Sequence, residues 1–396
     1  MTEHVPSTWR QWLAVSALGV GSFAIVTTEL APVGLLSPIG AELGQSEATV
    51  ALAVTLYAWI GAAAALASVT LLSGMRRRPL LVSLMALLAL SALISGLANS
   101  FGMLMAARLA GALAHGAFWA MIGTLGAQIV PPEKVGLATS IIFGGVSAAS
   151  VLGIPAASFI GGLAGWQTAF LAVAALAALV AVTLRGSVPD LPGQPGISAA
   201  TLGRIARDGR FVPIFAVTIL SIMAHFMAFT FVEPYLATQL AVGPTTIALL
   251  LFVFGGAGLL ANVLCGALID RHLKTLLMGA LTVSSVALGM LTLPVTSGTP
   301  VLAGLCLSAW GGAVAIILVG LQTWILKDAG KDALPASAIY VALFNGAIGL
   351  GAALGAAILS VAGMPVLFAV AALLTLACLV ALAALETPGV AVEQRG

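Results

Sequence analysis

Glu29, Arg108 and His115 each stand inside a stretch of sequence that is otherwise apolar. An ionised side chain at the centre of a bilayer costs on the order of 2.5–3.5 kcal/mol, so such residues face a cavity or a partner. A carboxylate there can take up and release a proton, an arginine keeps its charge and needs an anion or carbonyl, and a histidine can carry a proton. These residue types predict a proton-coupling site.

Each of the three residues also has a structural explanation. Glu29 could be a surface carboxylate, but its apolar stretch continues for about 12 Å beyond it at a helical rise of 1.5 Å per residue, so we favour coupling. Arg108 could bind backbone carbonyls alone. His115 lies seven residues after Arg108 on roughly the same helix face, and it could carry a proton, donate to a sugar hydroxyl or simply pack in the core.

A second group of side chains could contact a transported solute. Aromatic rings provide apolar faces for a sugar ring or a drug, and amide, imidazole and carboxylate groups bind hydroxyls. The alternatives are aromatic packing at the membrane interface, a solvated vestibule for the acid and hydrogen bonding between helices for the amide. The candidates are Tyr57, Trp119, His225, Glu233 and Asn345.

Patterns typical of catalysis or metal binding are missing from the sequence. The four histidines form no H-E-x-x-H, there is no G-x-S-x-G, and the three cysteines lie far apart without C-x-x-C spacing. The Gly-rich runs follow no strand, so they are not phosphate loops. We therefore expect no enzyme activity, no metal and no cofactor.

Composition decides which elements must position these residues. The chain has 396 residues, 61% of them hydrophobic and only 7% charged, and its mean hydropathy is +1.16. Soluble domains are about 45–50% apolar and about 25% charged. This balance excludes a soluble enzyme, a nucleic-acid binder and a disordered protein. It predicts an all-α membrane protein with about twelve transmembrane helices of about 20 residues each.

A hydropathy window of about 19 residues places the individual spans. They are expected near 12–36, 49–72, 79–98, 101–128, 135–160, 166–184, 212–236, 245–268, 275–294, 299–323, 335–361 and 364–385. The polar stretch 186–211 is rich in Pro, Gly and Arg and predicts a cytoplasmic linker. It divides the chain into two six-helix halves, 1–185 and 212–396.

The basic residues predict the orientation of the spans. All of the 15 Lys and Arg residues except Arg108 fall in the termini or in even-numbered connections. Because positively charged loops stay in the cytoplasm, both termini and these connections are expected there.

The two halves look related, as in the parallel six-span repeats of major facilitator transporters. Gly266–Arg271 resembles the second-half copy of the signature G-x-L-x-D-R-x-G-R of that superfamily. Gly74–Pro79 resembles the first-half copy, although it lacks the usual acidic residue. The resemblance implies pseudo-symmetric halves in the major facilitator fold. The residues it suggests for conformational gating are Arg76, Arg77, Asp270 and Arg271.

Two further motifs resemble the drug–proton antiporter branch of this superfamily. Arg108–Gly111 is similar to the intramembrane arginine motif of that branch, and the fifth span carries segments similar to its antiporter signature, with Gly-Ile-Pro in place of the commoner Gly-Pro. These segments are Gly153-Ile154-Pro155, Gly161-Gly162 and Gly165-Trp166.

Four short segments resemble the bacterial sugar efflux transporters, which export arabinose and thiogalactosides. They are Thr27–Leu36, Tyr57-Ala58-Trp59, Ala114–Trp119 and Glu233-Pro234. The resemblance implies a proton-coupled antiporter in the bacterial inner membrane that exports a sugar-like solute by alternating access. Multidrug efflux by the same fold is the alternative. The expected partners are the solute, protons and the lipid bilayer, without nucleic acid, and we expect a monomer.

Overall fold

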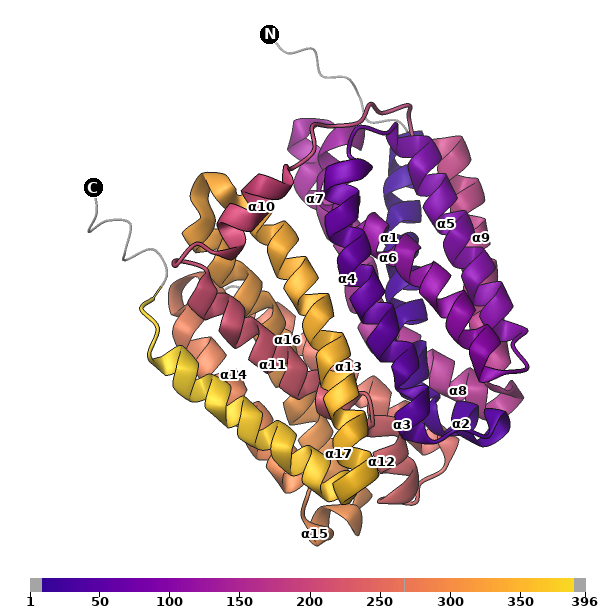
Figure 1. Cartoon of the computed structure of the whole chain (residues 1–396), viewed down its shortest axis with the longest axis vertical. Helices are drawn as coiled ribbons and strands as arrows, with labels where there is room; N and C mark the ends of the chain where they lie inside the picture. Colours follow the sequence, from indigo (N-terminus) through magenta and orange to yellow (C-terminus); the bar gives the residue numbers. More distant parts are fainter. Residues whose placement is uncertain (1–8, 267, 388–396) are drawn as a thin grey trace.

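The computed structural model describes residues 9–266 and 268–387, except for the side chains of 123, 124, 266, 270 and 297. Within this part of the chain every regular element is a helix (Figure 1). The first half contains α1 (Trp9–Leu30), η1 (Ala31–Gly34), α2 (Leu36–Leu43), α3 (Glu47–Val50), α4 (Leu52–Leu71), α5 (Arg77–Gly96), α6 (Phe101–Ile129), η2 (Pro132–Lys134), α7 (Val135–Ala148), η3 (Ala149–Gly153), α8 (Ile154–Ala164) and α9 (Trp166–Ser187). The remainder contains α10 (Ala199–Ala206), α11 (Val212–Phe229), α12 (Val232–Thr238), α13 (Pro244–Gly266), α14 (Ile269–Met290), α15 (Pro294–Ser297), α16 (Pro300–Ala329), η4 (Gly330–Asp332) and α17 (Ala333–Ala383).

Ten segments of the described chain are long and apolar enough to cross a membrane. The last of them, Pro300–Ala383, joins α16 and α17, and α17 is itself broken at Gly363. Gly363 has a φ of 80°, which glycine adopts without steric cost, and Pro365 cannot donate a backbone hydrogen bond. Counted as three passes, this segment completes the twelve predicted spans. The predicted fold class is confirmed.

The first span is not the single helix predicted over 12–36. It ends as an α-helix at Leu30 and continues as the 3₁₀ turn η1. Pro32 has no N–H, so it cannot donate to the carbonyl of Thr28, and the helix tightens at this point. The Thr28 carbonyl is therefore left without its usual helical partner.

The fifth span is also interrupted. A π-helical turn, η3, separates α7 from α8 just before Pro155. Proline removes one backbone donor and clashes with the carbonyl four residues earlier, and a π turn accommodates this. Gly153 ends the turn against α1, where a Cβ atom would overlap the Thr27 side chain. Glycine is thus required for this close contact.

The helices form two groups that meet along a few helix pairs (Figure 1). We call the end of the bundle that holds residues 188–211 the linker end, and the end that holds α2, α3 and α12 the far end. Two buried apolar clusters each belong to one group, one running from Ala14 to Val188 and one from Leu202 to Leu382. A third cluster draws on both groups and includes Leu36 and Phe231. The groups therefore share a core only over part of their length.

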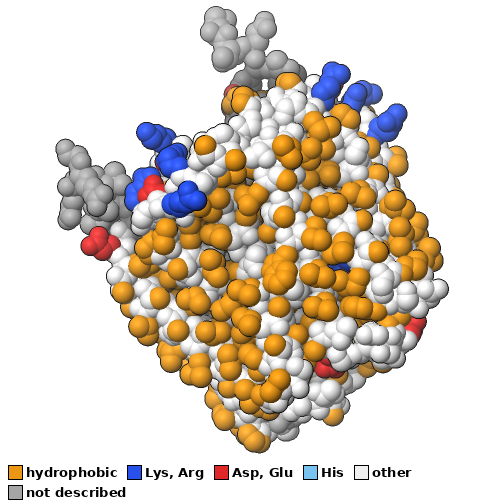
Figure 2. Space-filling view, viewed as in Figure 1, with side chains coloured by type: hydrophobic (Ala, Val, Ile, Leu, Met, Phe, Trp, Pro, Cys, Tyr) orange, Lys and Arg blue, Asp and Glu red, His pale blue; other side chains and the backbone are white. Residues whose placement is uncertain are grey.

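The outer surface fits a bilayer. Large apolar side chains are widely exposed, among them Leu71, Val182 and Val263. On the face shown in Figure 2, hydrophobic side chains cover a broad belt, and Lys and Arg gather at the rim of the linker end. The protein is a multi-pass membrane protein.

Candidate functional site

Arg108 is buried in α6 and joins three helices through backbone carbonyls. Its guanidinium donates to Ala53 O at 3.1 Å, to Thr28 O at 2.9 Å and to Glu29 O at 3.0 Å. The Thr28 carbonyl is the one that Pro32 leaves without a helical donor. The sequence left open whether Arg108 binds an anion or backbone carbonyls. Its hydrogen bonds go to carbonyls, one of which, Thr28 O, is freed by the kink in α1.

The Glu29 carboxylate faces His115. Oε2 of Glu29 lies 3.8 Å from Nδ1 of His115, and both side chains are buried. Oε1 of Glu29 and both ring nitrogens of His115 have no hydrogen-bond partner within the described part of the chain. A buried carboxylate beside an imidazole can accept and release a proton.

The pair also borders the second group of helices. The Asn345 side chain of α17 lies next to the His115 imidazole, while its Nδ2 donates to Val341 O at 2.9 Å. Nearby, Trp59 Nε1 of α4 donates to Gly346 O of α17 at 3.2 Å. A Cβ atom on Gly349 would overlap Trp59. The predicted coupling residues and Asn345 thus meet where α4 and α17 pack together.

Tyr57 and Trp119 flank His115 on its own side. The ring centroids are 5.3 Å apart for Tyr57 and His115, and 6.2 Å apart for His115 and Trp119. The Arg108 guanidinium lies 4.5 Å from the centre of the Tyr57 ring. With Asn345, the structure therefore brings together six of the predicted site residues; the other five are Glu29, Tyr57, Arg108, His115 and Trp119.

His225 belongs to a separate aromatic cluster in the second group. Its ring stacks on Phe229 with centroids 5.0 Å apart and meets Trp310 edge-on at 5.4 Å. Phe254 packs against the same rings. Nδ1 of His225 and Nε1 of Trp310 are buried and have no partner among the described residues. Sequence reasoning missed Phe254 and Trp310 because aromatic residues in spans carry no signal that separates packing from binding.

Glu233 lies at the far end and connects the two groups. Its Oε2 accepts a hydrogen bond of 2.9 Å from the backbone N–H of Ser37, in the first turn of α2. No side chain of the first group caps this helix. Ser37 Oγ also donates to Glu47 at 3.0 Å. Glu233 therefore serves as a helix cap from the opposite group.

The arginines suggested for gating lie at the linker end. Arg76 is exposed and forms an ion pair with Asp190. Arg77 is buried, and its Nε and Nη1 atoms have no partner among the described residues. Arg271 is exposed, and the Asp270 side chain lies outside the described part of the structure. No hydrogen bond or ion pair in the described chain joins these arginines to the opposite group of helices.

The linker end contains an apolar cavity of about 450 Å³. It lies between α4, α11 and α17, and Ala206 of α10 forms part of its wall. Its walls are Leu66, Ala206, Val212, Phe215, Ala216, Ile219, Ile339, Ala342 and Leu343. The far end, in contrast, is closed by shared core, by the Ser37–Glu233 hydrogen bond and by the contact of Gly162 with Pro244.

Comparison with known proteins places the fold. A sequence model of the Major Facilitator Superfamily matches residues 16–337 and, separately, 214–396. Three similar solved structures are those of transporters. A mutant of the nucleoside transporter NupG has a TM-score of 0.77 at 14% identity, covering 94% of this chain and 99% of that one. A bacterial homologue of the human lysosomal transporter Spinster, in an inward-facing and occupied conformation, has 0.72 at 15%, covering 95% and 97%. The human organic anion transporter MFSD10 has 0.69 at 16%, covering 94% and 99%.

Proposed function

The chain belongs to the Major Facilitator Superfamily, and we propose that this transporter is a proton-coupled exporter of sugars or sugar-like small solutes. The halves 1–185 and 212–396, joined by the linker 186–211, rock about a central site. The observation that carries the proposal is the buried Glu29 carboxylate beside His115, at the contact between the first half and Asn345 of the second.

Proton binding at this place can bias the conformation because it changes the charge at a contact between the halves. With Glu29 ionised, its negative charge faces the imidazole 3.8 Å away. With Glu29 protonated, the buried negative charge is removed and a new O–H donor appears. A ligand shifts a conformational equilibrium by its differential affinity for the two states, and here the proton is that ligand. Arg108 supports the site by holding the backbone of Glu29 and Thr28.

The surroundings of His115 favour a polar solute with a ring. The imidazole can bind a hydroxyl, and Tyr57 and Trp119 offer flat faces beside it. The Tyr57 hydroxyl is buried without a hydrogen-bond partner among the described residues, so a sugar hydroxyl could supply one. Asn345 can contribute from the second half.

The alternative, multidrug efflux by the same fold, is favoured by the aromatic cluster of His225, Phe229, Phe254 and Trp310. Stacked aromatic faces bind flat or cationic drugs well. If the protein is a multidrug exporter, the solute binds mainly to the second half. The protein then protects cells against lipophilic cations and does not export sugars.

The direction of export depends on the orientation of the membrane protein. We infer that the linker end is cytoplasmic, because almost all Lys and Arg residues gather in its connections. Both termini then lie in the cytoplasm of the bacterial inner membrane. A reporter fused within residues 186–211 should be cytoplasmic, and a periplasmic result would refute the two-half arrangement.

The decisive experiment measures proton movement in proteoliposomes on addition of solute. Arabinose, a thiogalactoside, ethidium and chloramphenicol are compared for the wild type, Glu29→Gln and Glu133→Gln. Glu133 is an exposed carboxylate in η2 that takes no part in the candidate site, and it serves as the control. Proton release driven by a sugar, lost only in Glu29→Gln, supports the proposal. Release driven only by the drugs supports the alternative, and no release with any solute refutes proton coupling.

A further inference from the structure

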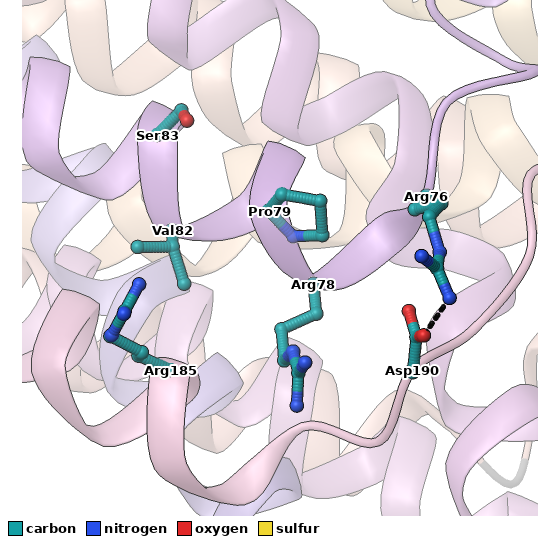
Figure 3. Close-up of a pocket in the computed structure, with 7 residues that line it drawn as sticks. All are labelled: Arg76, Arg78, Pro79, Val82, Ser83, Arg185 and Asp190. Atoms are coloured by element: carbon teal, nitrogen blue, oxygen red, sulfur yellow. Dashed lines mark hydrogen bonds and ion pairs between the residues drawn. The ribbon is translucent and has the colours of Figure 1, made fainter.

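Three guanidinium groups line one cavity at the linker end of the first half. The cavity has a volume of about 280 Å³ and is lined by Arg76, Arg78, Pro79, Val82, Ser83, Arg185 and Asp190. Figure 3 shows arginines from two helices, α5 and α9, around the loop that carries Asp190. The proposed transport of solute makes no use of this cavity.

The charges in the cavity do not balance. Arg76 pairs with Asp190, the one carboxylate in the wall. Arg78 and Arg185 have no hydrogen bond or ion pair with any described residue, so the wall carries a surplus of two positive charges. The neighbouring Arg77 adds a buried guanidinium without a partner for Nε and Nη1 among the described residues. A bound anion would neutralise this surplus of positive charge.

The position-holding role of basic residues does not explain this geometry. Arginines that only fix orientation need to lie on the correct side of the membrane, and they gain nothing from converging on one cavity. Here α5 contributes Arg78, the N-cap position of that helix contributes Arg76, and α9 contributes Arg185 to the same space. The planar guanidinium group of an arginine can bind two oxygens of one phosphate through two parallel hydrogen bonds.

The cavity borders an apolar strip on the outer face of α9. On α9, Arg185 lies one helical turn from Val182, which in turn lies one turn from Leu179, so the three share a face. Val182 is 71% exposed and Leu179 is 62% exposed. Apolar side chains this exposed face acyl chains in a membrane protein. A phosphate held at Arg185 would therefore have hydrocarbon directly beside it.

The geometry points to a binding site for a phosphate ester in this cavity, and the adjacent apolar face identifies the ester as the headgroup of an anionic phospholipid. Its phosphate is held by Arg78 and Arg185, and its acyl chains lie along Val182 and Leu179. Bound in this way, the lipid would bridge α5 and α9 next to Asp190, where the linker is attached to the first half.

The test uses the full-length protein, purified in detergent and stripped of lipid. Retention of phosphatidylglycerol and of phosphatidylcholine is measured by native mass spectrometry for the wild type, Arg78→Gln and Arg185→Gln. Arg207→Gln is the matched control, since Arg207 is an exposed arginine of the same membrane face outside the cavity. An interfacial arginine contributes about 1 kcal/mol towards anionic lipid, so each cavity variant should bind phosphatidylglycerol roughly five-fold more weakly.

A variant that binds more tightly separates recognition from damage to the fold. Asp190→Asn raises the positive surplus of the cavity, so it should retain phosphatidylglycerol roughly five-fold better than the wild type. A general loss of structure cannot produce that gain.

Three outcomes decide the proposal. Weaker binding in both cavity variants, unchanged binding in Arg207→Gln and preference over phosphatidylcholine support it. Equal retention by the cavity variants and the control overturns it. If glycerol 3-phosphate binds as tightly as phosphatidylglycerol, with the same dependence on Arg78 and Arg185, the site takes a soluble phosphate ester and the lipid assignment is wrong.

Discussion

Removing the Glu233 carboxylate should open the far end of the protein. Its hydrogen bond to the backbone N–H of Ser37 measures 2.9 Å and is partly buried, and it joins segments 196 residues apart. A hydrogen bond to a charged group contributes about 1.5–3 kcal/mol, which corresponds to roughly a 10- to 150-fold change in an equilibrium. Glu233→Ala should therefore lower, by that factor, the ratio of molecules whose far end is closed to molecules whose far end is open. Glu233→Gln keeps a neutral acceptor and should have a smaller effect.

Pulsed electron–electron spin resonance can measure this ratio. Spin labels are attached at Ala41 and Gln239, which are exposed on opposite sides of the contact, after the three native cysteines are replaced. The distance distribution should gain a longer component in Glu233→Ala. Glu47→Ala is the matched control, because Glu47 accepts a hydrogen bond from the same serine but belongs to the same half.

Two results would refute this reasoning. If Glu233→Ala and Glu47→Ala lengthen the distance equally, the effect comes from α2 itself and not from a bond between the halves. If neither variant changes the distribution, the shared apolar core alone holds the far end closed.

The remaining predictions concern coupling, stability and the linker. Glu29→Gln should abolish uphill export and leave the protein folded; export against a gradient that still collapses with a protonophore would place the proton carrier elsewhere. Arg108→Ala should lower the free energy of unfolding by about 2–5 kcal/mol, measured by denaturation in detergent, because three buried carbonyls lose a charged donor; Arg108→Lys should lose less, and an unchanged stability would contradict the scaffold role. Asp332→Asn should speed hydrogen exchange in α10, because it removes the carboxylate that accepts a 2.9 Å hydrogen bond from Arg204 of that helix. Arg210, just after α10, holds the pKa of Asp208 below its ordinary value of 3.8. The stabilisation by the Asp208 carboxylate is therefore complete above pH 3.8 and is lost only as the pH falls through the lowered pKa. Exchange in wild-type α10 should not accelerate between neutral pH and about pH 5.

Prolines account for most of the difference between predicted and observed helices. The hydropathy profile predicted continuous spans over 12–36 and 135–160, whereas the structure breaks them at Pro32 and before Pro155. A window average cannot detect the loss of one N–H group, although the proline itself is visible in the sequence. The break at Gly363 was predicted correctly, since one span was expected before it, over 335–361, and another after it, over 364–385.

The candidate site was predicted in its residues but not in its contacts. Glu29, Arg108 and His115 were recognisable because charge inside an apolar span is costly. Sequence alone could not decide whether Arg108 binds a carboxylate or carbonyls. The structure assigns it to carbonyls, one of them freed by the kink at Pro32.

The sequence by itself determined that the chain crosses a membrane many times and where its basic connections gather. Hydropathy and charge are properties of consecutive residues, so both can be read along the chain. Only the tertiary structure decided that Glu233 caps α2 and that Asn345 lies beside His115. In lipid, helices associate by close packing of small side chains and occasional polar contacts, because burial of apolar surface does not drive them together. Such contacts depend on the shapes of surfaces distant in sequence, and no periodic pattern records them.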